Sequence, residues 1–410
     1  MLLVNPRASR CAYPADLKAV MSVASARESR DWLSGWEYLS REATPLWELP
    51  GLAAELGIGR FWVKDESTRS PLGSFKALGA PIALIRLILR LMPQRAFDPK
   101  VLIQGGYQQH LRDFTVISAT DGNHGRALAA AAQSVGCQCV IVLHANVSTE
   151  REAAIAAYGA RIIRIEGNYD ESVEHTAHVA EQNGWPVVSD TSYEGYEVVP
   201  RDVMQGYGTI GAELIEQTTA DSTAPCLFTH VFLQGGVGGM AAGIGSYLWE
   251  VYQDQRPVFV MVEPQQADCL YQSAVQGRAA KATGSVDSVM AGLACGETSP
   301  LAWRFLEPSV DFFLTISDDD AVTAMQRLAQ GSATDIPIVA GESGVAGLAA
   351  LQRLVADPQA ATKIGINHES RILIINTEGA TAPTVYQQLV GEPGEAVLAR
   401  QHQWQIKTPA

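Results

Sequence analysis

The chain has 410 residues, enough for about two or three domains or for one large domain with an insertion. Hydrophobic residues make up 47% of it and charged residues 18%, which excludes a disordered chain and a coiled coil. It carries 30 Lys and Arg against 44 Asp and Glu, and the formal charge of −14 opposes non-specific binding to nucleic acid or to anionic membranes. Any anionic ligand must therefore be bound by local geometry.

Targeting and cysteine patterns point to a reducing compartment. The apolar run within Met1–Arg7 is too short for a signal peptide, and the longest apolar window, 77–92, is interrupted by a proline and two arginines. We expect a cytoplasmic protein without a membrane segment, in which 77–92 forms a partly buried helix. The six cysteines form no Cys-x-x-Cys pair of the kind found at zinc or redox sites, so no metal is expected. A bridge between Cys269 and Cys295 stays open as an alternative.

From about residue 60 onward, short β-branched runs alternate with helical patterns. The runs are continuously apolar, which is typical of parallel strands buried on both faces, and the alternation predicts a doubly wound α/β fold. The predicted strands are 61–63, 114–118, 140–143, 161–165, 231–233, 258–262 and 372–375. The predicted helices are 123–135, 149–158, 171–183, 238–253, 318–330 and 343–355. We expect Thr149 and Glu152 to form a capping box, and Ser343 to be an N-cap.

A glycine-rich segment, Gly235-Gly-Val-Gly-Gly239, joins a predicted strand to a predicted helix. Consecutive backbone N–H groups at such a junction converge on an oxyanion, and the helix N-terminus adds partial positive charge. The segment therefore indicates a phosphate site. A dinucleotide site, with Glu263 directed to a ribose, is the competing interpretation, and a tight turn without a ligand is another.

Lys76 begins an apolar helical pattern in the segment Ser74-Phe-Lys-Ala-Leu-Gly79. Burial disfavours the ammonium form, so we expect a lowered pKa and an amine that can form a Schiff base. The alternative is an ordinary surface lysine. A cation in the first turn of a helix opposes the helix dipole, which disfavours that alternative in part.

The segment Asp121-Gly-Asn-His-Gly125 follows the predicted strand 114–118. It lies at the carboxyl edge of the predicted sheet, where open α/β sheets bind ligands. Asp121 offers a carboxylate, Asn123 offers a neutral donor, and the N-terminus of the next helix can bind a substrate carboxylate. The alternative is that Asp121 and Asn123 only cap the helix, but capping requires just one of them.

Taken in this order, these segments resemble the fold-type II pyridoxal-phosphate enzymes of the tryptophan synthase β-like group, over roughly 44–382. The strings Ala119-Thr-Asp-Gly-Asn-His-Gly-Arg126 and Asn376-Thr-Glu-Gly379 are similar to those of the diaminopropionate ammonia-lyases. The resemblance implies an α/β fold of two doubly wound parallel-sheet domains with the cofactor in the cleft. Residues 1–88 and 200–410 would form the large domain, and 89–199 a smaller inserted α/β domain. It also implies a homodimer.

The implied cofactor is pyridoxal 5′-phosphate. The resemblance makes Lys76 the Schiff-base lysine, Asn123 the partner of the cofactor's phenolic oxygen, and Thr377 the group facing the pyridine nitrogen. The phosphate would lie against Gly235, Gly236, Val237, Gly238 and Gly239. The substrate would lie against Ser118, Thr120, Asp121, His124 and Asp190. Asp190 would bind the distal amine, with an Asx turn as its alternative role.

The implied reaction is α,β-elimination of D- and L-2,3-diaminopropionate to pyruvate and ammonia. Lys76 and Asp121 would act as bases on opposite faces of this small amino acid, with Asp190 as a third catalytic group. One alternative is a same-fold serine/threonine-type dehydratase or β-replacing synthase acting on another β-substituted amino acid. Another is a non-catalytic metabolite-binding protein of the same fold, which the presence of Lys76 disfavours. No nucleic acid or membrane partner is expected.

Overall fold

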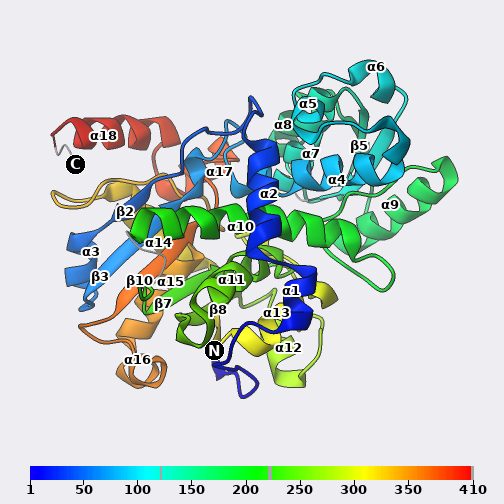
Figure 1. The fold of residues 1–410 in the computed structure, drawn as a ribbon. Coiled ribbons are helices and arrows are strands. Elements are labelled where there is room, and N and C mark those ends of the chain that lie inside the picture. The colour runs from blue at the N-terminus through cyan, green and yellow to red at the C-terminus, as the bar shows by residue number, and fades with distance from the viewer. Residues whose placement is uncertain (121, 220–223, 408–410) are drawn as a thin grey trace.

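A computed structural model describes residues 1–120, 122–219 and 224–407. It contains a seven-stranded sheet with the order β1-β9-β8-β7-β10-β3-β2 and a separate three-stranded sheet with the order β4-β5-β6 (Figure 1). The strands are β1 (Leu2–Val4), β2 (Leu46–Glu48), β3 (Arg60–Asp65), β4 (Thr115–Ala119), β5 (Gln138–Leu143), β6 (Arg161–Arg164), β7 (His230–Gln234), β8 (Val258–Pro264), β9 (Phe312–Ile316) and β10 (Arg371–Asn376).

The central strands run parallel, as their continuous apolarity predicts. This holds for β9-β8-β7-β10-β3 in the large sheet and for all three strands of the small sheet. The doubly wound α/β prediction is therefore confirmed. The edge strands β1 and β2 pair antiparallel with β9 and β3 instead. Each has three residues, too few to carry a periodic pattern, and neither they nor β9 were among the predicted strands.

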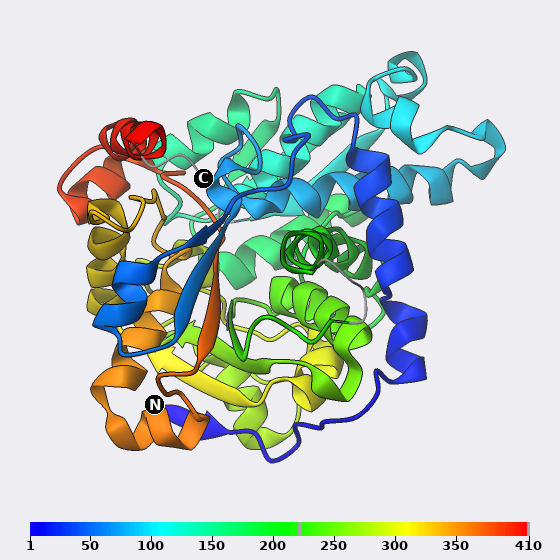
Figure 2. The same ribbon diagram turned by 60° about the vertical axis from the view of Figure 1, so that its left-hand side comes forward.

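Helices cover both sheets (Figure 2). They are α1 (Ala15–Val20), α2 (Val23–Leu33), α3 (Pro50–Glu55), α4 (Ala80–Leu91), α5 (Pro99–Ile103), α6 (Gln108–Leu111), α7 (Asn123–Val135), α8 (Thr149–Ala156), α9 (Tyr169–Asn183), α10 (Val198–Thr218), α11 (Gly239–Tyr252), α12 (Cys269–Gln276), α13 (Pro300–Ser309), α14 (Asp318–Gln330), α15 (Ala346–Ala356), α16 (Pro358–Ile364), α17 (Pro383–Val390) and α18 (Gly394–Lys407). Short 3₁₀ turns are η1 (Glu66–Thr68), η2 (Phe75–Leu78), η3 (Pro93–Arg95), η4 (Gln253–Gln255) and η5 (Ala291–Leu293).

Two predicted helix caps are wrong. The side chain of Ser148, one residue before Thr149, accepts the hydrogen bond from the Arg151 N–H and caps α8. Ser343 caps no helix, because α15 begins at Ala346. The Ser343 hydroxyl instead accepts a hydrogen bond from the Gly292 N–H at 3.0 Å, within the cleft described below.

The strands of the two sheets come from different parts of the chain. Those of the small sheet all lie within 89–199, and those of the large sheet lie outside it. However, the predicted boundary at residue 88 falls inside α4, and that at 199 falls inside α10. The exact domain boundaries therefore stay a prediction.

Within the described chain, no helix has the length and apolarity needed to span a membrane. The window 77–92 forms the end of η2 and then α4, which is mostly buried. None of the six cysteines, all of which lie in the described ranges, forms a disulfide, so Cys269 and Cys295 are not bridged in this structure. Among the residues placed, no group of three or more His, Cys, Asp or Glu side chains could hold a metal ion.

Candidate active site

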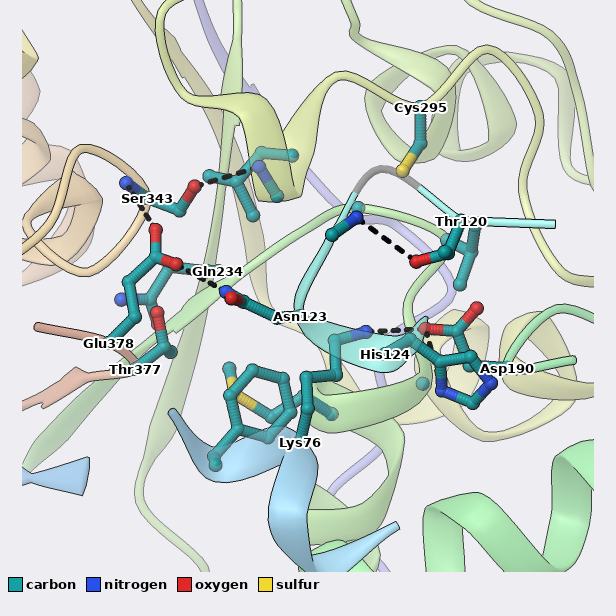
Figure 3. Close-up of a pocket in the computed structure, with 18 of the residues that line it drawn as sticks. Lys76, Thr120, Asn123, His124, Asp190, Gln234, Cys295, Ser343, Thr377 and Glu378 are labelled. Atoms are coloured by element: carbon teal, nitrogen blue, oxygen red, sulfur yellow. Dashed lines mark hydrogen bonds and ion pairs between the residues drawn. The ribbon is translucent and has the colours of Figure 1, made fainter. Parts of the chain in front are cut away.

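Segments that follow strands of both sheets line one cleft, which encloses about 920 Å³ of empty space with its mouth included (Figure 3). The predicted site residues that line it are Lys76, Thr120, Asn123, His124, Asp190, Gly236, Val237, Gly238, Gly239 and Thr377. Gly235 and Ser118 are not among the described lining residues. Ser118 is fully buried and donates its hydroxyl hydrogen to the Ala119 carbonyl. Asp121 lies outside the described residues.

Lys76 lies on η2, and its amine forms an ion pair with the carboxylate of Asp190 across the cleft (Figure 3). Burial by itself lowers the pKa of the Lys76 ammonium, but the charge and the hydrogen bond of Asp190, together with Tyr207 and Cys295, raise it overall. Burial likewise raises the pKa of Asp190, but the charge and the hydrogen bond of Lys76, together with His124 and a backbone hydrogen bond, lower it overall. The predicted low pKa of Lys76 is therefore wrong for this arrangement. Sequence reasoning placed both residues in the site but did not pair them.

His124 is buried beside this ion pair. Its Nε2 lies 2.8 Å from the Val188 carbonyl oxygen, and its Nδ1 lies 3.8 Å from Asp190 Oδ2. Burial lowers the pKa of His124, so the ring is neutral near pH 7. Because a carbonyl oxygen can only accept, Nε2 carries the hydrogen. Nδ1 is then an acceptor directed at the space that Asp190 also faces.

Asn123 is the first residue of α7, but it does not cap that helix. The Oγ1 of Thr120 accepts hydrogen bonds from the Gly122 and Gly125 N–H groups, at 3.1 and 3.2 Å, and satisfies two donors at this helix end. The Asn123 side chain donates to the Glu378 carboxylate instead. The capping alternative is therefore wrong for Asn123.

The glycine loop (235–239) connects β7 to α11. Gly238 has a φ of +98°, which favours glycine, and a Cβ on Gly235 would lie 2.6 Å from the Cγ of Glu263. Glu263 accepts hydrogen bonds from the N–H groups of Leu270 and Tyr271, at 2.8 and 2.7 Å. Its carboxylate thus links β8 to α12 rather than facing a ribose, and the dinucleotide interpretation loses its acidic residue. The N-terminus of α11 offers N–H groups for an anion.

Two buried acidic residues in the cleft region were not predicted from the sequence. Glu378 follows Thr377 and accepts a hydrogen bond from the Ser343 N–H at 3.2 Å. Glu342 forms a 2.6 Å ion pair with Arg151, which also lines the cleft. Burial and the charge of Glu378 raise the pKa of Glu342 to about 7, although Arg151 acts to lower it. Glu378 could have been inferred from its place in the Asn376-Thr-Glu-Gly379 string.

Comparisons with known proteins agree with this arrangement. A family model described as pyridoxal-phosphate dependent enzyme matches residues 39–378. The diaminopropionate ammonia-lyase of Escherichia coli K12 is 39% identical over 362 residues, which cover 86% of this chain and 88% of the relative. The Salmonella typhimurium enzyme of the same name is 35% identical over 355 residues, covering 85% and 87%.

Solved structures of the same family are also similar to this chain. The Escherichia coli diaminopropionate ammonia-lyase in complex with an aminoacrylate-PLP azomethine reaction intermediate superposes with a TM-score of 0.83 and 36% identity, covering 95% of this chain and 96% of that one. Threonine deaminase isoform 2 of Solanum lycopersicum, at 20% identity and a TM-score of 0.70 over 95% and 96% of the two chains, shares the fold. The resemblance inferred from the sequence motifs is confirmed.

Proposed function

Because the chain belongs to the family of pyridoxal-phosphate-dependent enzymes, we propose that it binds pyridoxal 5′-phosphate in this cleft and eliminates ammonia from 2,3-diaminopropionate. The observation that carries the proposal is the position of Lys76. Its side chain shares one cleft with the glycine loop, Asn123 and Thr377 (Figure 3).

The lining residues fit the chemistry of this cofactor. The glycine loop and the N-terminus of α11 suit a phosphate, since a Cβ on Gly236 would lie 3.1 Å from the Gly292 carbonyl oxygen and narrow that side of the cleft. Lys76 suits the aldehyde carbon and the Asn123 amide suits the phenolic oxygen. Thr377 offers a hydroxyl, which suits a ring nitrogen that stays largely unprotonated. We propose these residues as the cofactor site.

In the proposed reaction, 2,3-diaminopropionate and water give pyruvate and two molecules of ammonia. When bound, pyridoxal phosphate draws electrons from the bonds of the substrate's α-carbon. Lys76 and Asp121 accept the α-proton from opposite faces, so that each enantiomer meets one base. Asp190 and Nδ1 of His124 are both acceptors, and they bind the distal ammonium, which has only hydrogens to donate.

The two-base proposal predicts a different outcome for each enantiomer. We expect Asp121→Asn to lower the elimination rate for one enantiomer of 2,3-diaminopropionate by about 10²–10⁴-fold, the usual contribution of a positioned base, and to spare the other. Pyruvate release from each pure enantiomer measures this. Asp113→Asn, which changes an aspartate with 92% of its side chain exposed, is the matched control. Equal losses on both enantiomers would rule out two bases.

The ion pair predicts a pH effect on cofactor capture. Only the neutral Lys76 amine can attack the cofactor aldehyde, and Asp190 raises the pKa of Lys76 although burial lowers it. In Asp190→Asn the charge of Asp190 is lost while burial stays, so the Lys76 pKa falls and the midpoint of capture moves to lower pH. Absorbance of the apoprotein titrated with pyridoxal phosphate at a series of pH values measures the midpoint. Asp190→Glu keeps the charge and should move it little. An unchanged midpoint in Asp190→Asn would show that Asp190 does not raise the pKa of the lysine that captures the cofactor.

The function itself is tested by the visible spectrum and by product release. We expect purified protein to show a lysine-bound cofactor band and to release pyruvate fastest from 2,3-diaminopropionate among β-substituted amino acids. Faster release from serine or threonine would favour a dehydratase. A protein that cannot be loaded with pyridoxal phosphate would contradict the proposal.

We also propose that the enzyme is a homodimer of the cytoplasm. The dimer is supported by family membership, and the location by six cysteines that form no disulfide in the described chain, which is typical of reducing compartments. Sedimentation equilibrium tests the dimer.

A further inference from the structure

Glu378 lies just beyond the carboxyl end of β10, a central strand of the large sheet, and several contacts fix its position. It follows β10 and is 3% exposed, and its backbone forms an isolated bridge with Ser74, two residues before Lys76. Its carboxylate accepts hydrogen bonds from the Ser343 N–H and the Thr381 hydroxyl, both at 3.2 Å, and from the Asn123 side-chain amide. These donors come from separate segments of the chain, so the carboxylate has little freedom to move.

The contact with Asn123 determines which way that amide faces. An ionised carboxylate can only accept hydrogen bonds, so it requires the NH₂ end of Asn123 and excludes the flipped amide, whose oxygen would face it. The Asn123 NH₂ group has a second hydrogen, which is available to an acceptor in the cleft. In Figure 3, Asn123 lies between Glu378 on one side and Lys76 on the other.

We propose that Glu378 is a positioning residue, which holds the Asn123 amide so that its second N–H is directed at the phenolic oxygen of the cofactor. This inference rests on the proposed function. An amide that could flip would present its oxygen to the phenolic oxygen for part of the time, and two acceptors repel each other. Glu378 thereby acts on the phenolic oxygen through the orientation of the Asn123 amide.

The contact also joins the two parts of the fold. Asn123 begins α7, directly after the segment that follows β4 of the small sheet, whereas Glu378 follows β10 of the large sheet. A second pair repeats this pattern, since Arg151 of α8 reaches Glu342 at 2.6 Å. A purely structural role for Glu378 in holding the two sheets together is therefore the rival explanation. It differs from the proposal because it does not require Asn123 to contact the cofactor.

A double-variant cycle separates the two explanations. We expect Glu378→Met to weaken pyridoxal phosphate binding about five- to tenfold, the effect of one lost hydrogen bond, and to shift the band of the lysine-bound cofactor. Asn123→Ala should weaken binding at least as much. The double variant should bind as Asn123→Ala does, because Glu378 acts through that amide. The dissociation constant is measured by ultrafiltration without substrate.

The matched control is Thr381→Val, which removes a donor to the same carboxylate and leaves the Asn123 contact in place. We expect binding within about twofold of wild type. The inference is overturned if Glu378→Met binds as wild type does, or if it costs the same factor with and without Asn123. Should Glu378→Met fail to fold, as judged by circular dichroism, the same cycle is run with Glu378→Gln. That amide can present either end to Asn123, so about a two- to fivefold loss is expected, again absent in the Asn123→Ala background. Wild-type affinity in Glu378→Gln would then overturn the inference.

The wild-type protein distinguishes this inference from the proposed function. A wild type without a lysine-bound cofactor band refutes the proposed function. A wild type with that band, accompanied by an unaffected Glu378 variant, refutes only the role of Glu378.

Discussion

Replacement of Lys76 by alanine is expected to lower pyruvate release by at least about 10²–10⁴-fold and to remove covalent attachment of the cofactor. The reason is that Lys76 supplies the amine in the cleft that faces both the proposed cofactor site and the substrate acceptor Asp190. Borohydride reduction followed by mass spectrometry measures the attachment, since wild type gains the cofactor mass and the variant should not. Lys281→Ala, which changes a lysine with 77% of its side chain exposed, should behave as wild type.

An adduct that persists in Lys76→Ala would assign the attachment to another lysine. Lys64 is also buried, but its amine donates to Glu213 at 2.7 Å and to the Thr44 carbonyl at 2.7 Å, and it does not line the described cleft. Peptide mapping of the reduced protein would identify the lysine and so decide the matter independently of activity.

The regular parts of the fold could be predicted because local sequence determines them. The predicted helices 123–135 and 318–330 match α7 and α14 at both ends. In contrast, α10 was missed although it has 21 residues and crosses the middle of the molecule in Figure 1, whereas Figure 2 shows it nearly end-on. The sequence pattern did not indicate this helix because it contains glycines, which are unfavourable inside a helix. A Cβ on Gly206 would lie 2.0 Å from the Leu78 carbonyl oxygen, so close packing requires residues that otherwise predict a break.

The site likewise has parts that could be predicted from the sequence and parts that could not. Asn123 could be predicted because it follows a predicted strand, at the carboxyl edge where α/β sheets bind ligands. Thr120 and Thr377 could be predicted only from the family resemblance. The contacts between distant segments could not. Lys76 and Asp190 are 114 positions apart, and Asn123 and Glu378 are 255 apart. Sequence periodicity does not reveal contacts between residues so far apart in the chain. The direction of the Lys76 pKa shift could therefore be determined only from the structure.

A buried ion network behind the site gives the largest expected effect on stability. The carboxylate of Glu213, on α10, accepts hydrogen bonds from Lys64 Nζ at 2.7 Å and from Arg69 Nη1 and Nη2 at 2.6 and 2.7 Å. The side chains of Lys64, Arg69 and Glu213 are at most 2% exposed. Glu66 also pairs with Arg69, at 2.8 Å, so the network holds two cations and two anions. It ties α10 to β3 and to the segment that leads into η2.

We expect Glu213→Ala to lower the free energy of unfolding by about 3–5 kcal/mol, because it leaves two buried cations facing one anion. Urea denaturation measures this. Glu216→Ala, on the same helix, removes the partner of Arg30 at 2.6 Å, but 58% of the Glu216 side chain is exposed, so we expect a loss of only about 0–1 kcal/mol.

The loss in Glu213→Ala should also depend on pH. Burial already lowers the pKa of Lys64, and removal of the Glu213 charge lowers it further. A lysine whose pKa is lower in the folded state than in the unfolded state releases its proton first in the folded state. The unfolded state then binds more protons, so stability rises with pH between these two pKa values. The stability deficit of Glu213→Ala should therefore shrink as the pH rises through the lowered pKa of Lys64 in the folded variant toward the ordinary pKa of a lysine, because neutral Lys64 no longer needs a partner. A deficit equal to that of Glu216→Ala, or one that grows with pH, would show that Lys64 is not an unpaired buried cation in the variant.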